Sequence, residues 1–193
     1  MSAPRERRMQ GQRGVVMVEA ALLLPVIMMI ALCAIDFGLA WRDRMRTETA
    51  VRSGARTGSN LKNDSLTDYN VLQAVKAGLA DIPTANIDRI VVFNANTTGT
   101  VPSSCAAGTA STGAGGTVAC NVYTAASMSL ASSSFACGST APDRFWCPTN
   151  RVVNQAAGED YIGVWVEAHR SRITGFVPGI TKIHATAVMR LEP

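Results

Sequence analysis

Residues 15–35 read VVMVEAALLLPVIMMIALCAI, an apolar run of 21 residues with a single charged residue, Glu19. At about 1.5 Å per residue, a helix of this length spans roughly 32 Å, enough to cross a bilayer core of about 30 Å. Pro25 is compatible with such a helix and is expected to kink it. We therefore expect one membrane-spanning helix. Its carboxylate needs an explanation, because a charge inside a bilayer costs about 2.5–3.5 kcal/mol.

The residues ahead of this run are basic. Residues 1–14 hold four arginines against one glutamate, a local charge of +3 that makes up most of the net charge of +4 of the chain. Because basic flanks stay on the cytoplasmic side, this leader predicts a cytoplasmic N-terminus and a periplasmic or extracellular C-terminal domain. A discarded secretory signal is disfavoured, since its apolar part is usually only about 7–15 residues long and a small-residue cleavage site follows it.

The spacing between Gly14 and Glu19 distinguishes this helix from a plain membrane anchor. If a peptidase cuts after Gly14, Val15 becomes a new N-terminus with a positive amine, and Glu19 becomes the fifth residue of the mature chain. A carboxylate there could neutralise the amine of a neighbouring subunit, so that both charges are buried only as a pair. The sequence therefore predicts peptidase cleavage between Gly14 and Val15 and a role for Glu19 as an assembly carboxylate.

Residues 14–58 also carry a set of motifs that resembles a known family. They are Gly14 followed by Glu19, then LLP at 23–25, IDFG at 35–38 and AVRSGAR at 50–56. This combination closely resembles the TadE-like pseudopilins of tight-adherence (Flp-type) pili, a branch of the type IV pilin superfamily. Ala20 stands where that family often has Phe or Tyr.

The resemblance implies a minor pilin or pseudopilin that takes part in pilus assembly and is processed after Gly14 by a prepilin peptidase. The implied partners are that peptidase, the major Flp-type pilin, a second pseudopilin and an inner-membrane assembly platform. The implied location is the cytoplasmic (inner) membrane or the pilus itself. The implied fold is pilin-like, with a long N-terminal helix laid across an antiparallel sheet.

We divide the chain into the leader, the span, a helical extension over residues 36–58 and an exported α+β domain over residues 59–193. The extension is expected to end near Gly54 and Gly58.

Phe37, Trp41 and Met45 recur at every fourth position of the extension. This favours a helix face that packs on the chain's own domain over a seam in an assembly, although the two can hold along different lengths.

The exported part predicts a second short helix and an antiparallel sheet of three or four strands. The helix is expected over residues 70–79, with Asp68 or Asn70 as its cap. Residues 96–117, rich in Ser, Thr, Ala and Gly, predict a long flexible loop. Residues 125–150 are expected to be irregular, with Phe145, Trp146 and Cys147 as a local anchor. The expected strands are residues 87–95, 118–124, 161–169 and 183–191.

Five cysteines are present, and four of them lie in the part expected to be exported. An even set in an exported domain predicts two disulfides that staple the loop region. Four cysteines allow three pairings. We favour Cys105–Cys120 and Cys137–Cys147, because these close short loops. Zinc is disfavoured because no pair has the close spacing of a zinc knuckle.

The sequence offers no catalytic constellation and no phosphate-binding loop, so we expect neither enzyme activity nor a cofactor. Glu167, His169 and His184 could converge if their strands pair, but solvated strand residues are far more common than a metal site built on so few ligands. The basic excess lies in the leader, so no nucleic-acid partner is expected. The alternative function is a membrane-anchored binding module that recognises a surface or ligand through residues 96–160 and never enters a filament.

Overall fold

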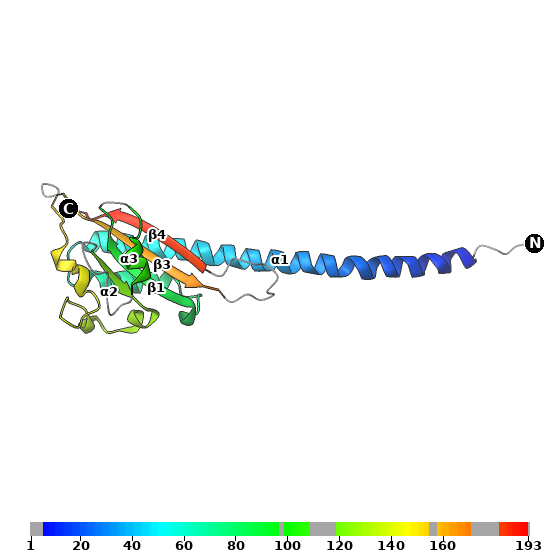
Figure 1. The fold of residues 1–193 in the computed structure, drawn as a ribbon, viewed down its shortest axis with the longest axis horizontal. Helices are drawn as coiled ribbons and strands as arrows, with labels where there is room; N and C mark the ends of the chain where they lie inside the picture. Colours follow the sequence, from blue (N-terminus) through cyan, green and yellow to red (C-terminus); the bar gives the residue numbers. More distant parts are fainter. Residues whose placement is uncertain (1–5, 97–98, 109–118, 155–157, 171–181, 193) are drawn as a thin grey trace, which may run out of the picture.

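The computed structural model describes residues 6–96, 99–108, 119–154, 158–170 and 182–192. A single helix, α1 (Glu6–Leu61), projects far out of an α+β domain, and only its C-terminal part packs against that domain (Figure 1). The C-terminal end of the described chain lies at the opposite end of the molecule from the N-terminus. The predicted α+β class with a long apolar N-terminal helix is confirmed.

The helix α1 does not end at Gly54 or Gly58, as the sequence predicted, but continues to Leu61. Both glycines are packing positions. A Cβ on Gly54 would lie 2.7 Å from Cγ2 of Val75, and one on Gly58 would collide with Ile162. The helix stops where Lys62 takes a φ of 60°, the left-handed conformation that commonly terminates helices.

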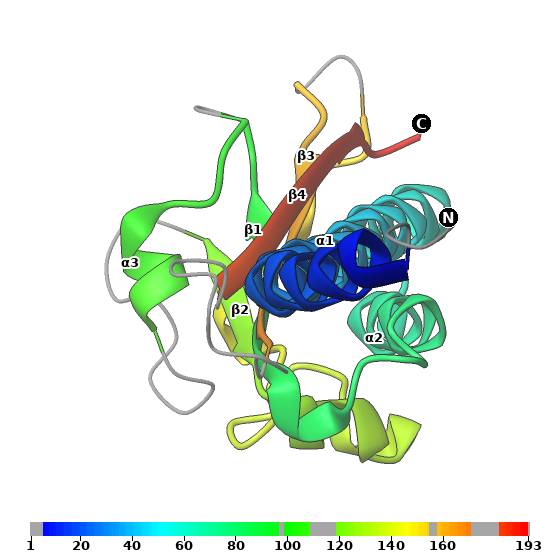
Figure 2. The ribbon, with the colours of Figure 1, turned by 90° about the vertical axis from the view of Figure 1, so that its right-hand side faces the viewer.

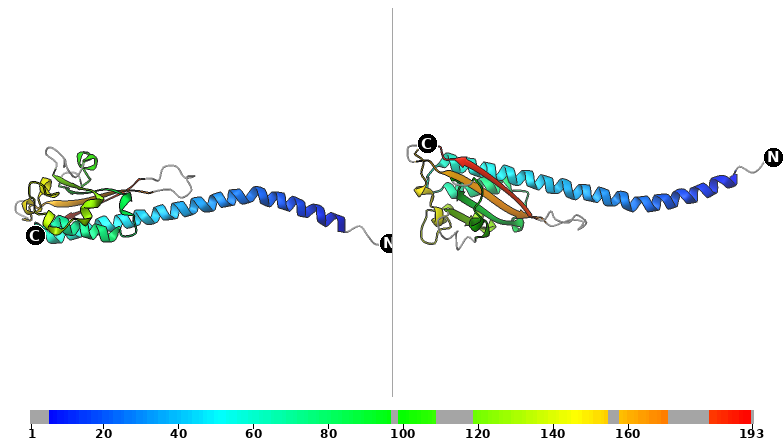
Figure 3. Two further views of the ribbon diagram at one scale, coloured as in Figure 1. Left: turned by 90° about the horizontal axis from the view of Figure 1, so that it is seen from below. Right: turned by 45° about the horizontal axis from the view of Figure 1, so that its top comes forward.

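Along its membrane-side half α1 bends (Figure 3), and this half contains Pro25. Proline removes one backbone hydrogen bond and its ring crowds the preceding turn, so it accounts for the bend.

The second helix, α2 (Thr67–Gly78), packs beside α1 (Figure 2). It begins three residues earlier than predicted, after Leu66, and no side chain caps its first turn. The expected cap is therefore wrong for both Asp68 and Asn70. Asp68 is instead buried inside the domain.

Four strands are present, β1 (Ile87–Asn94), β2 (Cys120–Tyr123), β3 (Tyr161–His169) and β4 (Lys182–Arg190). Within the described chain they form one antiparallel sheet in the order β2-β1-β3-β4, which confirms the predicted sheet. In the pair formed by the inner strand β3 and the edge strand β4, Tyr161 lies opposite Arg190 at one end and His169 lies opposite Lys182 at the other. The segment that connects these two strands lies outside the described residues.

The sheet has a buried cluster on each face. The main core lies between the sheet and the helices α1 and α2, and includes alternate residues of β3, Ile162, Val164 and Val166. The opposite face carries a smaller cluster around Phe93 and Trp165, beneath the short helix α3 (Ser103–Ala107). Because successive side chains of a strand point to opposite faces, alternate residues of each strand enter different clusters, as the strand sequences predicted.

The loop region is more ordered than predicted. Residues 103–107 form α3 rather than loop, whereas residues 97–98 and 109–117 of the expected flexible segment lie outside the described residues. Residues 125–150 contain four short 3-10 turns, and within the expected anchor Trp146 is the buried residue. The 3-10 turns of the domain are η1 (Thr84–Asn86), η2 (Ala125–Ser129), η3 (Ser132–Ser134), η4 (Arg144–Trp146) and η5 (Pro148–Asn150).

Candidate functional site: the exposed helix and its surroundings

From residue 14 to residue 31, α1 is apolar on all its faces apart from Glu19, and no other described part of the chain packs around it. Every residue from 14 to 31 is exposed. A helix that is apolar all round belongs either in a packed core or in a membrane, and here no core surrounds it. Among the described residues, α1 is the helix long and apolar enough to cross a bilayer. The chain therefore has the form of a single-pass membrane anchor followed by a soluble domain.

Gly14, Val15 and Glu19 all lie on this exposed stretch of α1. Apart from the neighbouring backbone of α1 itself, no described atom lies within 4 Å of the position that a Cβ on Gly14 would take, so the segment is open on that side. Val15 and Glu19 are four residues apart, about 6 Å along the axis and close to one full turn. Cleavage at Gly14 and pairing by Glu19 remain predictions.

Phe37, Trp41 and Met45 lie just beyond the apolar span and are 58%, 57% and 48% exposed. The expectation that this stripe packs on the chain's own domain is therefore wrong. The face of α1 that does pack there carries Ala50 and Val51 instead. The rings of Phe37 and Trp41 stack on each other, with centroids 6.4 Å apart.

Inside the domain, a polar cluster that sequence reasoning missed centres on Asp68. Its Oδ2 accepts hydrogen bonds from Asn121 Nδ2 at 2.7 Å and from the Tyr123 hydroxyl at 2.5 Å. Its Oδ1 accepts from Arg151 Nη2 at 2.6 Å. The side chains of Asp68 and Arg151 are both 0% exposed, so this ion pair is sealed from solvent.

Trp146 completes the cluster. Its backbone carbonyl accepts hydrogen bonds from the side chains of Asn121 and Arg151, and its backbone N–H donates to Asn121 Oδ1. The guanidinium carbon of Arg151 lies 4.0 Å from the centroid of its ring. Burial, and then the negative charge of Asp68, raise the pKa of Tyr123 well above its usual value. A cluster sealed from solvent and tied together across these distant segments is suited to fixing the domain fold.

The structure holds two disulfides, Cys105–Cys120 and Cys137–Cys147, the pairing favoured from the loop lengths. The second lies next to Trp146. The carboxylate of Asp143 accepts the backbone N–H groups of Ala136 and Cys137, each at 3.0 Å, and so holds the start of that loop. Cys33, within the apolar span, is a free thiol.

Two of the three residues weighed as metal ligands, Glu167 and His169, are occupied by other partners. Glu167 and His184 face each other across β3 and β4. However, Glu167 pairs with Arg89 and Lys182. His169 Nδ1 lies 2.7 Å from Asp88. Within the described part of the chain, no three His, Cys, Asp or Glu side chains are grouped to hold a metal ion.

Comparison with known proteins gives one match. A family model described as TadE-like protein matches residues 14–56, which hold the apolar span and the helix that follows it. No curated protein and no solved structure matches the chain. The resemblance drawn from the sequence motifs is therefore confirmed over residues 14–56, where the chain is similar to TadE-like proteins.

Proposed function

We propose that this chain is a minor pilin or pseudopilin that takes part in assembling a tight-adherence (Flp-type) pilus. The observation that carries the proposal is the exposed apolar half of α1 with one carboxylate in it. A helix that serves only as an anchor gains nothing from Glu19, whereas a helix that must pack against its neighbours in a fixed register can use it.

The processing step would create the partner of that carboxylate. A prepilin peptidase cuts after Gly14 on the cytoplasmic side of the inner membrane, and the amine of Val15 becomes positively charged. Glu19 of one subunit then pairs with the amine of the next. Since a lone carboxylate in the bilayer costs about 2.5–3.5 kcal/mol, relief of that cost favours assembly over the isolated subunit.

The implied partners are the major Flp-type pilin, a second pseudopilin and the inner-membrane assembly platform. The first two would contact the apolar span directly, because it has the exposed surface that a neighbouring helix needs. The soluble domain would lie on the periplasmic or extracellular side of the membrane, opposite the cytoplasmic N-terminus.

Two measurements test the proposal in the native host. Mass analysis of the mature protein is expected to find Val15 as its first residue. An intact leader in cells with an active peptidase would contradict the processing step.

Glu19→Gln is expected to preserve membrane insertion and abolish or strongly reduce piliation. The matched control is Glu48→Gln, which removes a carboxylate from the same helix where it lies outside the membrane and pairs with Arg44. Normal piliation with Glu19→Gln would rule out the assembly role, and would instead favour an anchored binding module that stays out of the filament.

A further inference from the structure

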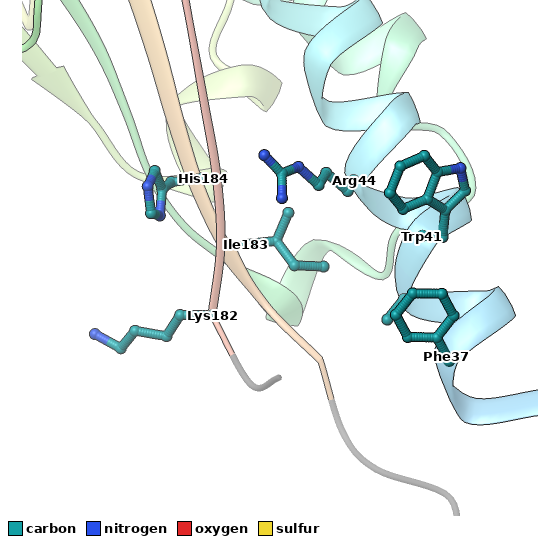
Figure 4. Close-up of a pocket in the computed structure, with 7 residues that line it drawn as sticks. Phe37, Trp41, Arg44, Lys182, Ile183 and His184 are labelled. Carbon is teal, nitrogen blue, oxygen red and sulfur yellow. The ribbon is translucent and has the colours of Figure 1, made fainter. Parts of the chain in front are cut away.

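A shallow groove lies where α1 leaves the membrane-side end of the domain. Phe37 and Trp41 line it from the helix and Ile183 lines it from the start of β4, around a volume of about 240 Å³. Figure 4 shows Ile183 pointing toward α1, while Lys182 and His184 extend from the other side of β4. The floor of the groove is therefore apolar.

The position of the groove relative to the span decides what it meets. The apolar run ends at Ile35, and Phe37 and Trp41 follow it by two and six residues, or about 3 and 9 Å along the axis. The headgroup layer adds roughly 5–7 Å on each side of the bilayer core. Helical side chains lean toward the N-terminus, so both rings reach back into this layer.

Arg44 lies at the rim of the groove, one turn after Trp41. Figure 4 shows its side chain extending from α1 toward Ile183. Its Nε donates to Glu48 at 3.3 Å, and within the described chain no acceptor bonds its two Nη groups. The side chain is 63% exposed. Two parallel N–H groups of an arginine match the oxygens of a phosphate.

We propose that this groove binds an anionic phospholipid of the leaflet that faces the domain. The Cα of Arg44 lies about 13.5 Å beyond Ile35, so its side chain leaves Glu48 and leans back toward the bilayer to place its Nη groups on the phosphate. The glycerol and upper acyl region lie against Phe37, Trp41 and Ile183. The proposal rests on membrane anchoring and is independent of pilus assembly, so the loss of one does not imply the loss of the other.

A second copy of this chain fits the groove less well. In the same membrane register, the neighbour would bring its own Arg42 and Arg44 to the depth of this Arg44, and like charges repel. The apolar span of a neighbour carries one acidic residue, Glu19, which lies toward the other face of the membrane. The acidic residues that a neighbour would bring near this depth, Asp36, Asp43 and Glu48, already have partners within their own chain.

Quenching of tryptophan fluorescence by brominated lipids tests the proposal on the full-length protein. The protein is reconstituted into vesicles of equal parts phosphatidylglycerol and phosphatidylcholine, with bromine on one lipid or the other. The quenching of Trp41 is obtained by subtracting the signal of the Trp41→Phe variant from that of the wild type. The two tryptophans left in that variant, Trp146 and Trp165, are buried inside the domain.

We expect brominated phosphatidylglycerol to occupy the site at Trp41 with about fivefold preference, the size of effect that one basic residue has at an anionic surface. Arg44→Gln should abolish this preference. Arg52→Gln, which removes another exposed arginine two turns further along α1, should retain it. Thermal unfolding of both variants confirms that the domain is folded.

Equal quenching by the two lipids in the wild type, or a preference that persists in Arg44→Gln, would overturn the proposal. Added inorganic phosphate should leave the preference unchanged, and its loss would identify a site for free anions instead. Trp41 quenching that disappears as the protein-to-lipid ratio rises would show that another copy covers the groove, and would equally overturn lipid binding.

Discussion

The buried ion pair between Asp68 and Arg151 gives the sharpest prediction about the stability of the domain. Asp68→Asn keeps the shape of the side chain but removes its charge, which leaves the guanidinium of Arg151 buried without a counter-ion. Nε and Nη1 of Arg151 already lack a hydrogen-bond partner within the described structure, so few protein groups can compensate.

The magnitude follows from this burial. Removing one partner of a buried pair costs about 3–5 kcal/mol. For a chain of 193 residues, each kcal/mol corresponds to about 2–4 °C in Tm. We therefore expect Asp68→Asn to lower Tm by roughly 10 °C. The underlying loss of about 3–5 kcal/mol is a large part of the unfolding free energy of an ordinary domain.

Thermal unfolding of the full-length protein in detergent, followed by circular dichroism, measures the effect. The matched control is Asp81→Asn, which breaks the 2.5 Å ion pair with Arg46, but from a side chain that is 62% exposed. Such an exposed pair contributes less than about 1 kcal/mol.

Replacing both buried partners, as Asp68→Leu with Arg151→Met, should recover part of the loss because no unpaired charge remains. The recovery is incomplete, since Asn121 and Tyr123 lose the acceptor that Asp68 gave them. Equal Tm values for Asp68→Asn and Asp81→Asn would refute the reasoning that burial makes the pair important.

Three further predictions concern the same domain. The raised pKa of Tyr123 means that the folded state keeps its phenolic proton to a higher pH than the unfolded state; the unfolding free energy should therefore fall as the pH rises above about 10, and fall less steeply in Tyr123→Phe, as urea titrations across that range would show. Gly58→Ala should cost about 1–3 kcal/mol because its Cβ would collide with Ile162. Gly38→Ala, which meets nothing within 4 Å, should instead be neutral or stabilise by up to about 1 kcal/mol, and equal Tm changes for the two would contradict this account. Replacing Cys137 and Cys147 together by Ser should lower the unfolding free energy, measured by chemical denaturation, by about 2–4 kcal/mol. Under reducing conditions the variant and the wild type should be equally stable at this loop, because the wild type has then lost the same bond.

Local patterns predicted much of the fold. The apolar run gave the long helix because it is continuous and strongly apolar, and the period-2 alternation of residues 161–169 and 183–191 gave two strands with the correct face inward. These signals are local, and packing reinforces them. The family motifs likewise lie within one continuous helix, which is why residues 14–56 could be recognised without the rest.

Contacts between distant residues could not be predicted in the same way. Gly54 and Gly58 resemble helix-ending glycines in sequence, and only the approach of α2 and β3 shows that they are contact points. Asp68 resembles a helix cap, because its true partner, Arg151, lies 83 positions away. A buried charge pair leaves no periodic trace in either segment, so nothing local identified it.

The continuity of α1 has a mechanical consequence. No flexible linker separates the anchor from the domain, since one helix belongs to both. The stretch from Ile35 to Leu61 is about 39 Å long, so a tilt of about 20° in the bilayer swings its far end sideways by roughly 13 Å. A force along the helix axis would move the domain by the same distance as the anchor. The helical connection also offers a protease no extended linker at which to cleave between the anchor and the domain. Any partner that reorients or lifts the membrane segment thereby repositions the whole sheet, with α1 acting as a lever.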